Sequence, residues 1–450
     1  MPPGPHDTIA ALPPASASPG TRSDYRVSKA RQFARRLRQF VRRFRQFVLW
    51  LILRPVGILL YPLLYMALTS ISRGRPIRLG TLNAKGRISI MITHIEPYLR
   101  KLQVEGVTTP LVIVLNPGPC PNEQLTIMYG RALWLVDGTR PWLRRVFTVV
   151  YHLLLAAGSS MAVRLRAGLR HEFAPAWRDG TPVLRFTAEE EKAGRELLRS
   201  LGVPEGASHI CFTVRDDAYY DELRRRRNSR RINDQAGKEY AARNPSVRSY
   251  LPMAIECAAS GHHVLRMGSV VAEPLPAGLH PGITDYASTR RTPFGDVYLL
   301  ATCKFAVSGA AGMYWISMAF NRPVVLTDAY ALAHPPVRPC DLYIPIKFWL
   351  IAEKRFLTFR EMLGDTDLLW TSERHIHRLG LELVHNTPEE VAAVVREMEQ
   401  RLNGTWVTTE DDEELQRCFQ TIWTPEHAAY GLPARIGAQF LRENKQLLET

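Results

Sequence analysis

The chain has 450 residues, of which 46% are hydrophobic, and it carries a formal net charge of +15. A chain of this length can bury two hydrophobic cores, which favours a large enzyme of two or three domains. Its six cysteines are scattered, with no CxxC pair and no tight His/Cys cluster, which argues against a disulfide framework or a zinc site and favours a reducing compartment.

The excess positive charge belongs to one segment near the N-terminus. Residues 1–24 are rich in Pro, Ala and Ser, and we expect them to be disordered. Between residues 25 and 95 there are 15 Lys and Arg and no Asp or Glu. From Ala30 to Val48, apolar residues recur at helical spacing between arginines, which predicts a basic amphipathic helix on an anionic membrane surface, with a short coiled coil as the alternative. The expected membrane contacts are Arg35, Arg36, Phe40, Arg42, Arg43, Phe44, Phe47 and Trp50.

An apolar run at residues 47–68 follows this helix directly. Its length would suffice for a membrane-spanning helix, which needs about 20 apolar residues. Arg54, Pro55 and Pro62 interrupt the run, and an arginine at the bilayer centre costs about 2.5–3.5 kcal/mol. We therefore expect residues 25–75 to form a bent, interfacial or re-entrant anchor, which would place the protein at the cytoplasmic face of the inner membrane as a peripheral or monotopic protein.

Residues 76–200 are expected to form a first α/β domain. Three apolar runs predict strands with helices between them, at 86–92, 109–115 and 132–136. His94 and Glu96 lie close to the end of the first run, and either is a candidate for the general base that deprotonates an acceptor hydroxyl. The alternative is that Glu96 only caps the helix that follows.

A second α/β domain is expected at residues 205–385, after a linker at 201–207. Short, buried strands are predicted at 208–214, 263–265 and 304–307. Polar clusters follow the strand ends, where the ligand crevice of an open α/β sheet lies. Because these clusters combine arginine with glycine, they indicate a phosphate site. The residues concerned are Arg215, Asp216, Arg266, Gly268, Asp285, Ser308, Gly309 and Gly312.

Residues 307–320 have the form of a strand, a small-residue turn and an apolar helix, as in a nucleotide-binding half-domain. No GxGxxG and no GxxxxGK[ST] pattern accompanies them, so neither a dinucleotide fold nor a P-loop is indicated. Arg215 and Arg266 would neutralise a pyrophosphate, and Ser308, Gly309 and the amides that follow would hold it. Asp285 could bind the base or ribose, and Asp216 is the first choice for the general base. The alternative is that the glycines only turn the chain and Arg215 makes a structural ion pair.

The remaining motifs favour simpler interpretations. The basic run at 224–231 has no interleaved aromatic residues, so a solvated loop or contact with an anionic acceptor is favoured over nucleic acid. Asp365 and Asp367 form a DxD pair outside any nucleotide-binding strand, and His375 and His377 have no nearby third ligand, so no metal site is expected. Residues 386–450 show helical spacing and are expected to pack back across the domains.

Several of these motifs together resemble bacterial glycosyltransferases associated with surface-polysaccharide synthesis. The resemblance covers roughly residues 76–400 and rests on Val214-Arg215-Asp216, the segment Arg243–Tyr250 with Asn244, Arg266-Met-Gly268, Asp285-Tyr286 and Ser308-Gly309. It implies two facing doubly wound, Rossmann-like domains of the GT-B type, with the acceptor in the first domain and a nucleotide sugar in the second, where Asn244 joins the donor site. The arginine turn is also similar to that of fucosyltransferases, although this chain has Thr213-Val-Arg215 where such enzymes often have His-x-Arg.

The sequence therefore predicts a membrane-associated, metal-independent glycosyltransferase without a cofactor. Its sugar would pass from a nucleotide-sugar donor to a lipid-linked or surface-polysaccharide acceptor. Two alternatives remain: a non-catalytic membrane-bound adaptor with a vestigial nucleotide crevice, and another phosphate-ester transferase on the same scaffold. The adaptor is favoured by Thr213, which stands where the similar enzymes often have the histidine of the His-x-Arg turn.

Overall fold

The computed structural model describes most of residues 51–449. The residues left out within this range are 71–76, 84–86, 108–110, 116–119, 137–139, 166, 168–170, 217, 219–220, 223–243, 310, 331, 333–334, 365–372, 426 and 428. The eight predicted membrane contacts between Arg35 and Trp50, the basic run at 224–231 and the Asp365–Asp367 pair lie outside the described residues. For these the sequence-based predictions stand as predictions.

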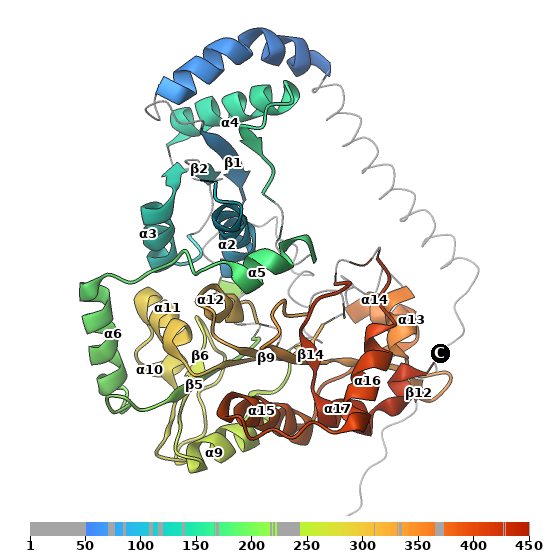
Figure 1. The fold of residues 1–450 in the computed structure, drawn as a ribbon. Helices are drawn as coiled ribbons and strands as arrows, with labels where there is room; N and C mark the ends of the chain where they lie inside the picture. The colour runs from blue at the N-terminus through green and yellow to red at the C-terminus, as the bar shows by residue number, and fades with distance from the viewer. Residues whose placement is uncertain are drawn as a thin grey trace, which may run out of the picture.

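The chain forms two parallel sheets with helices around them, as the predicted α/β class requires (Figure 1). The first sheet has the strand order β3-β2-β1-β4. Its strands are β1 (Arg78–Leu82), β2 (Leu111–Leu115), β3 (Trp134–Val136) and β4 (Ala162–Val163). The strands predicted at 109–115 and 132–136 are thus confirmed as β2 and β3.

The strand predicted at 86–92 is wrong, because these residues begin helix α2 (Ile88–Val104). The run is rich in β-branched residues, which favoured a strand. Ile88, Met91, Ile92 and Ile95 also follow the i, i+3, i+4, i+7 spacing of a helix, and the last three are fully buried. Burial of this stripe against the sheet and α12 outweighs the local strand preference. Glu96 consequently lies inside a helix and caps no helix end.

Helices cover both faces of the first sheet. Helix α4 (Pro141–Ala156) packs on one face, where Tyr151 and Leu154 meet Leu79 and Val112 of the strands. Helices α2 and α3 (Glu123–Ala132) cover the other face. Their outer sides contact helices of the second sheet (Figure 1). The first sheet is therefore the middle layer between α4 and the α2–α3 pair.

The helix Leu51–Ser70 lies along α4, on the side away from the sheet (Figure 1). Among the described residues it is the one helix that is long and apolar enough to cross a membrane, with a mean hydropathy of 1.8. It runs through Arg54, Pro55 and Pro62 as one helix, so the predicted interruption does not break it. At Gly57 the two helices approach so closely that a Cβ would lie 2.5 Å from the Leu153 carbonyl oxygen.

The second sheet has the strand order β14-β10-β9-β8-β5-β6-β7, and each of its described pairings is parallel. Its strands are β5 (His209–Val214), β6 (His263–Met267), β7 (Ile283–Thr284), β8 (Ala306–Gly309), β9 (Val324–Ala329), β10 (Leu342–Pro345) and β14 (Arg435–Ile436). The chain adds β6 and β7 on one side of β5 and then returns to place β8 on its other side. This is the order of a doubly wound α/β sheet, and its topological switch point lies between β5 and β8.

The C-terminal helices pack against the second sheet. Helix α15 (Pro388–Asn403) contacts α9 (Leu251–Ala259) and the strands β9 and β10, and α17 (Ala438–Glu443) packs on α15. A small antiparallel sheet of β12 (Arg355–Phe356), β11 (Lys347–Leu350) and β13 (Leu381–Val384) adjoins them. Residues 386–450 were expected to pack back across both domains, and the contacts named here are with the second sheet.

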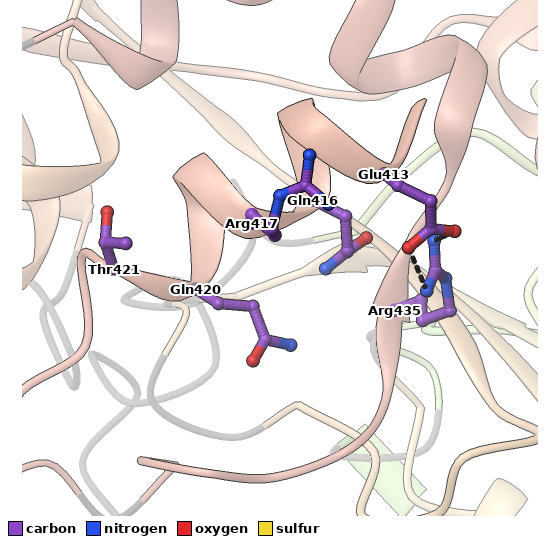
Figure 2. Close-up of a pocket in the computed structure, with 6 residues that line it drawn as sticks. All are labelled: Glu413, Gln416, Arg417, Gln420, Thr421 and Arg435. Atoms are coloured by element: carbon purple, nitrogen blue, oxygen red, sulfur yellow. Dashed lines mark hydrogen bonds and ion pairs between the residues drawn. The ribbon is translucent and has the colours of Figure 1, made fainter. Parts of the chain in front are cut away.

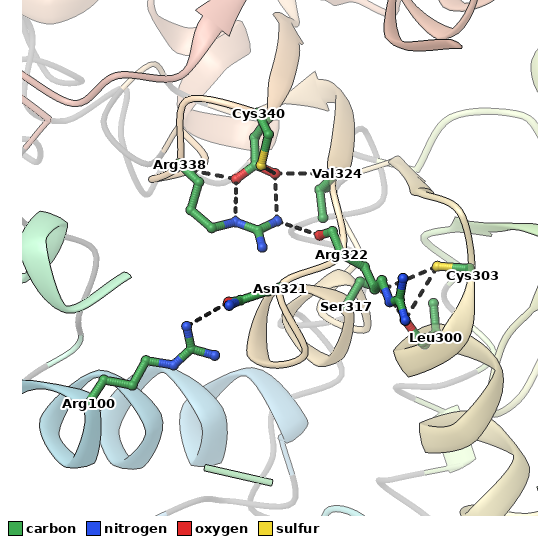
Figure 3. A network of polar contacts seen from close by, with 10 residues as sticks. Arg100, Leu300, Cys303, Ser317, Asn321, Arg322, Val324, Arg338 and Cys340 are labelled. Atoms are coloured by element: carbon green, nitrogen blue, oxygen red, sulfur yellow. Dashed lines mark hydrogen bonds and ion pairs between the residues drawn. The ribbon is translucent and has the colours of Figure 1, made fainter. Parts of the chain in front are cut away.

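The layers of the two sheets meet where α2 packs on α12 (Tyr314–Ala319) and α3 packs on α11 (Pro293–Thr302). Arg100 of α2 is fully buried there and donates to Asn321 Oδ1 at 2.7 Å (Figure 3). It also donates to the Ala319 carbonyl at 2.6 Å. Its Nε donates to Glu96 Oε1 at 2.9 Å, and its guanidinium lies 4.9 Å from the centre of the Trp177 ring. Arg100 therefore ties the first sheet's helix to the second sheet through a buried charge.

Candidate functional site

The candidate site lies at the switch point, where the carboxyl ends of β5 and β8 are neighbours. Val214 pairs with Gly309 in register, and the Arg215 amide donates to the Gly309 carbonyl at 3.1 Å. Two of the predicted donor-binding residues, Arg215 and Gly309, are thus brought together although 94 positions separate them. Ligands of open α/β sheets bind in the crevice outside such strand ends.

Asp216 follows Arg215 and shapes the loops at this edge. Its Oδ1 accepts from the Ala218 amide at 2.9 Å, and its Oδ2 accepts from the Ala272 amide at 2.7 Å. The half-buried carboxylate therefore joins the segment after β5 to the segment after β6. An ionised carboxylate has about four acceptor positions, so both oxygens retain room for one further proton donor.

The turn after β8 is supported from inside by Ser308. This side chain is fully buried, accepts from Thr213 Oγ1 at 3.0 Å and donates to the Ala311 carbonyl at 3.2 Å. Ser308 therefore holds the turn in place from below, which differs from the direct phosphate contact that the sequence suggested. Helix α12 begins at Tyr314 and has six residues, so the expected helix N-terminus lies two residues beyond Gly312 and is short.

Gly309 has no room for a side chain. A Cβ at this position would overlap the hydroxyl of Tyr250 and lie 3.2 Å from Pro245 Cγ. Asn244, next to Pro245, is half-buried, and its Oδ1 has no hydrogen-bond partner among the described residues. A buried, unpartnered amide oxygen beside the switch point is available to a ligand's donor group.

Arg266 and Asp285 form a buried pair that faces inward. Arg266 is 3% exposed, and its Nη1 donates to the Glu273 carbonyl at 2.6 Å and to Asp285 Oδ2 at 3.3 Å. The same Asp285 oxygen accepts from the Leu275 amide and from Ser288 Oγ, each at 2.8 Å. The pair thus holds the loop at 273–275. Arg266 Nη1 is thus bound by the Glu273 carbonyl and by Asp285, and the expected role of Arg266 as a pyrophosphate ligand stays a prediction.

Gly268 and Gly312 border the crevice in different ways. Gly268 follows β6, and a Cβ there would lie 2.8 Å from Val271 Cγ1. Gly312 is exposed, and a Cβ there would lie 3.3 Å from Ser89 Cβ, near the start of α2. The N-terminal turn of α2 therefore reaches the rim of the switch point from the first sheet.

Glu96 does not reach this rim. It is fully buried, its Oε1 accepts from Arg100 and from the Val183 amide at 3.0 Å, and its Oε2 accepts from Tyr129 Oη at 3.1 Å. Burial raises the pKa of Glu96, and Arg100 opposes that rise. This carboxylate therefore stabilises the interface between the layers. Because it is fully buried and paired, its expected role as a general base is corrected. His94, two residues earlier, is half-buried, and burial lowers its pKa.

A group of polar residues that the sequence analysis missed lies at the end of β9, next to β8. Asp328 is 1% exposed and has a φ of 47°, a left-handed conformation that non-glycine residues seldom adopt. Its Oδ1 accepts from the Asn386 amide at 2.9 Å and lies 3.0 Å from His385 Nδ1, and its Oδ2 accepts from Tyr250 Oη at 3.2 Å. Since Thr327 pairs with Gly309, this network borders the switch point.

Tyr250 connects this network to Gly309. Its ring is fully buried, and its hydroxyl lies 2.6 Å from Thr327 Oγ1. Burial and the neighbouring Asp328 carboxylate raise the pKa of Tyr250 well above its usual range, so the phenol stays protonated and donates to Asp328. The sequence carried one signal for the group, because Thr327 and Asp328 end an apolar strand as Arg215 and Asp216 do.

A separate hollow lies far from these residues in sequence, beside helix α16 (Glu410–Gln420), and has a volume of about 520 Å³ (Figure 2). Its lining residues are Glu413, Gln416, Arg417, Gln420, Thr421 and Arg435. Arg435 and Glu413 form an ion pair at 2.6 Å across it. None of the residues predicted for the donor site lines this hollow.

Comparisons with known proteins give matches among solved structures. No protein-family model matches the chain, and no curated protein matches it. The chain is similar to E. coli ADP-heptose LPS heptosyltransferase II, with 14% identity over 60% of this chain and 90% of that chain and a TM-score of 0.39. It is also similar to a family 9 glycosyl transferase from Veillonella parvula, with 10% identity, 60% and 86% coverage and a TM-score of 0.37. A third match is the iron-containing heptosyltransferase TibC in complex with ADP-D-beta-D-heptose, with 12% identity, 73% and 77% coverage and a TM-score of 0.37.

Proposed function

We propose that the chain is a membrane-associated glycosyltransferase that binds a nucleotide-sugar donor at the switch point between β5 and β8. The observation that carries the proposal is the pairing of Arg215 with Gly309 at neighbouring carboxyl ends of a doubly wound sheet. A pyrophosphate requires a positive charge and a backbone that it can approach closely, and these two residues supply both. The sequence resemblance to surface-polysaccharide glycosyltransferases supports the same function.

In this proposal the chain stabilises the leaving group. Arg215 offsets the charge that grows on the departing diphosphate, and the backbone amides after Gly309 approach its oxygens. Asn244 Oδ1, which has no partner among the described residues, accepts a hydrogen bond from the donor. The acceptor approaches from the first sheet, past Ser89 at the start of α2, and the helix Leu51–Ser70 keeps the enzyme near a lipid-linked or surface-polysaccharide acceptor. No step requires a metal ion.

The first experiment measures the binding of nucleoside diphosphates by calorimetry. Arg215→Ala should weaken this binding by about 1.5–3 kcal/mol because it removes a charge-assisted contact, while the affinity for the nucleoside alone should change little. Arg199→Ala is the matched control. Arg199 is an exposed arginine on α6 (Ala188–Ser200), the helix that precedes the amino end of β5, whereas the candidate site lies at the carboxyl end of this strand. Equal affinities in the parent and both variants would remove the donor site, and no binding by the parent would favour the non-catalytic adaptor.

A second experiment locates the group that takes the acceptor's proton. Asp216 is the candidate from the sequence, and the Asp328–His385 pair adds another, because Asp328 fixes the ring so that the more exposed His385 can accept a proton at Nε2. Replacing the correct group by a neutral side chain that cannot act as a base, in Asp216→Asn or His385→Gln, should lower kcat about 100-fold or more and leave donor affinity nearly intact. Single-turnover transfer measured from pH 5 to 9 would separate them, because the variant lacking the base should also lose the acidic limb of the profile.

A further inference from the structure

Helix α4 exposes an apolar stripe to solvent beside the part that the helix Leu51–Ser70 covers. Its exposed apolar residues Trp142, Val146 and Val149 are spaced i, i+4, i+7 and so lie in one line along the helix. Trp142 is 66% exposed, although a tryptophan is among the costliest side chains to leave in water. The opposite side of α4 is already used, since Tyr151 and Leu154 pack on the first sheet.

The helix Leu51–Ser70 carries a second stripe of the same kind. Five of its exposed apolar residues repeat at intervals of four and three over nearly the whole helix: Ile52, Val56, Leu59, Leu63 and Met66. Leu51, Ile58 and Tyr65 are exposed as well, which widens the apolar surface. Leu59 is 77% exposed. The helix is held beside α4 by the close approach at Gly57 and by Tyr61 and Leu64, which pack into the same hydrophobic cluster as α4. The two helices therefore lie one along the other at the outer edge of the first-sheet layers, at the top of Figure 1.

The charged residues of these two helices all have one sign. Arg54 lies in the helix Leu51–Ser70, and Arg140, Arg144 and Arg145 lie at the start of α4. Neither helix contains an Asp or Glu. Two apolar helices with arginines and no acid of their own complement an anionic lipid surface, where arginine meets the headgroups and tryptophan and leucine enter the acyl boundary.

The packing also decides how such a surface meets a bilayer. For the helix Leu51–Ser70 to span a membrane, it would have to leave α4 and expose Tyr61, Leu64 and Leu68, which are packed against the first-sheet layer. We propose that the helix Leu51–Ser70 and α4 together form a two-helix platform that lies flat in the interface of an anionic bilayer. The inference rests on the proposed membrane association and adds α4 as its second element, so that the membrane fixes the orientation of the first sheet and of the acceptor side of the crevice.

The test is co-sedimentation of the full chain with vesicles of phosphatidylcholine alone or mixed with phosphatidylglycerol. The triple variant Trp142→Ser, Val146→Ser, Val149→Ser should lower the partition into mixed vesicles at least about tenfold, because it removes the apolar contact of α4 and leaves Leu51–Ser70 in place. Its matched control is Ile255→Ser, Ile351→Ser, Val407→Ser, which changes three exposed apolar residues elsewhere and should partition as the parent does. A second variant, Arg140→Glu, Arg144→Glu, Arg145→Glu, should lose binding to the mixed vesicles and lose the salt dependence of that binding.

The outcomes separate lipid from other occupants of this face. If the α4 triple variant partitions into mixed vesicles as strongly as the parent does, the platform is wrong. A stronger partition of the triple variant would also overturn it, because another segment, such as residues 26–48, would then cover the stripe in the parent. Sedimentation velocity without lipid tests for a second copy of the chain. If the parent is a dimer and the triple variant is a monomer, the stripe on α4 is a contact between two copies. Calorimetry with a nucleoside diphosphate, run on the same samples without vesicles, keeps this result separate from the donor site, since the α4 variants should bind it as the parent does.

Discussion

Replacing Arg100 by alanine should lower the free energy of unfolding by about 3–5 kcal/mol, because it leaves the carboxylate of Glu96 buried without its charge partner. Both side chains are fully buried, and Arg100 also donates to Asn321 and to the Ala319 carbonyl across the interface between the layers. Urea denaturation followed by circular dichroism measures the loss. The variant should also open the contact between α2 and α12, which hydrogen exchange would detect in these two helices first.

The next residue along α2 provides a matched control. Lys101 and Glu105 form an i, i+4 pair at 3.7 Å in which both side chains are about half exposed. Lys101→Ala should cost less than about 0.5 kcal/mol, because an exposed pair of this kind adds little to stability. Equal losses in the two variants would mean that the buried pair contributes no more than a surface pair, which would contradict the structural part assigned to Arg100.

The stability that the protein loses in the Arg100→Ala variant should depend on pH. Burial raises the pKa of Glu96 above its unfolded value, and the loss of Arg100 would raise it further. A carboxyl with a raised folded pKa takes up a proton on folding, so its contribution to stability is present below the unfolded pKa and is lost as the pH rises through the folded pKa. The difference between the variant and the parent should therefore be smallest near pH 4 and grow toward neutral pH.

The parallel strands could be predicted from the sequence because their side chains are buried on both faces. The runs at 109–115, 208–214 and 304–307 are mostly apolar, and each overlaps a strand of the structure. The run at 86–92 failed because β-branched residues at helical spacing satisfy both patterns over seven residues. Burial against α12, which comes from a segment more than 200 residues away, decides between them.

The candidate site was predicted in part. Residues at strand ends could be found from the sequence, and the switch point brings Arg215 and Gly309 together as expected. The partners of a side chain could not be found in this way: Arg266 lies within β6, where successive residues face opposite sides, and its Nη1 donates to the Glu273 carbonyl and to Asp285. His385 reaches Asp328 from 57 positions away, a pairing that no local pattern indicates.

Gly309→Ala should weaken the binding of a nucleoside diphosphate at least about tenfold and cost about 1–3 kcal/mol of stability through overpacking. A Cβ at this position would overlap the Tyr250 hydroxyl, which cannot yield easily because it is held by Thr327 and Asp328 in a fully buried site. Tyr250→Phe removes the obstructing oxygen, so the double variant Gly309→Ala, Tyr250→Phe should recover part of the affinity, and the two changes should couple by about 0.5–3 kcal/mol. Gly130→Ala is the control, since Gly130 is exposed on α3, a Cβ there would meet no atom within 4 Å, and the change should be tolerated. Calorimetry and thermal unfolding of the four variants measure both quantities, and additive effects would show that Tyr250 does not connect the switch point to the Asp328 network.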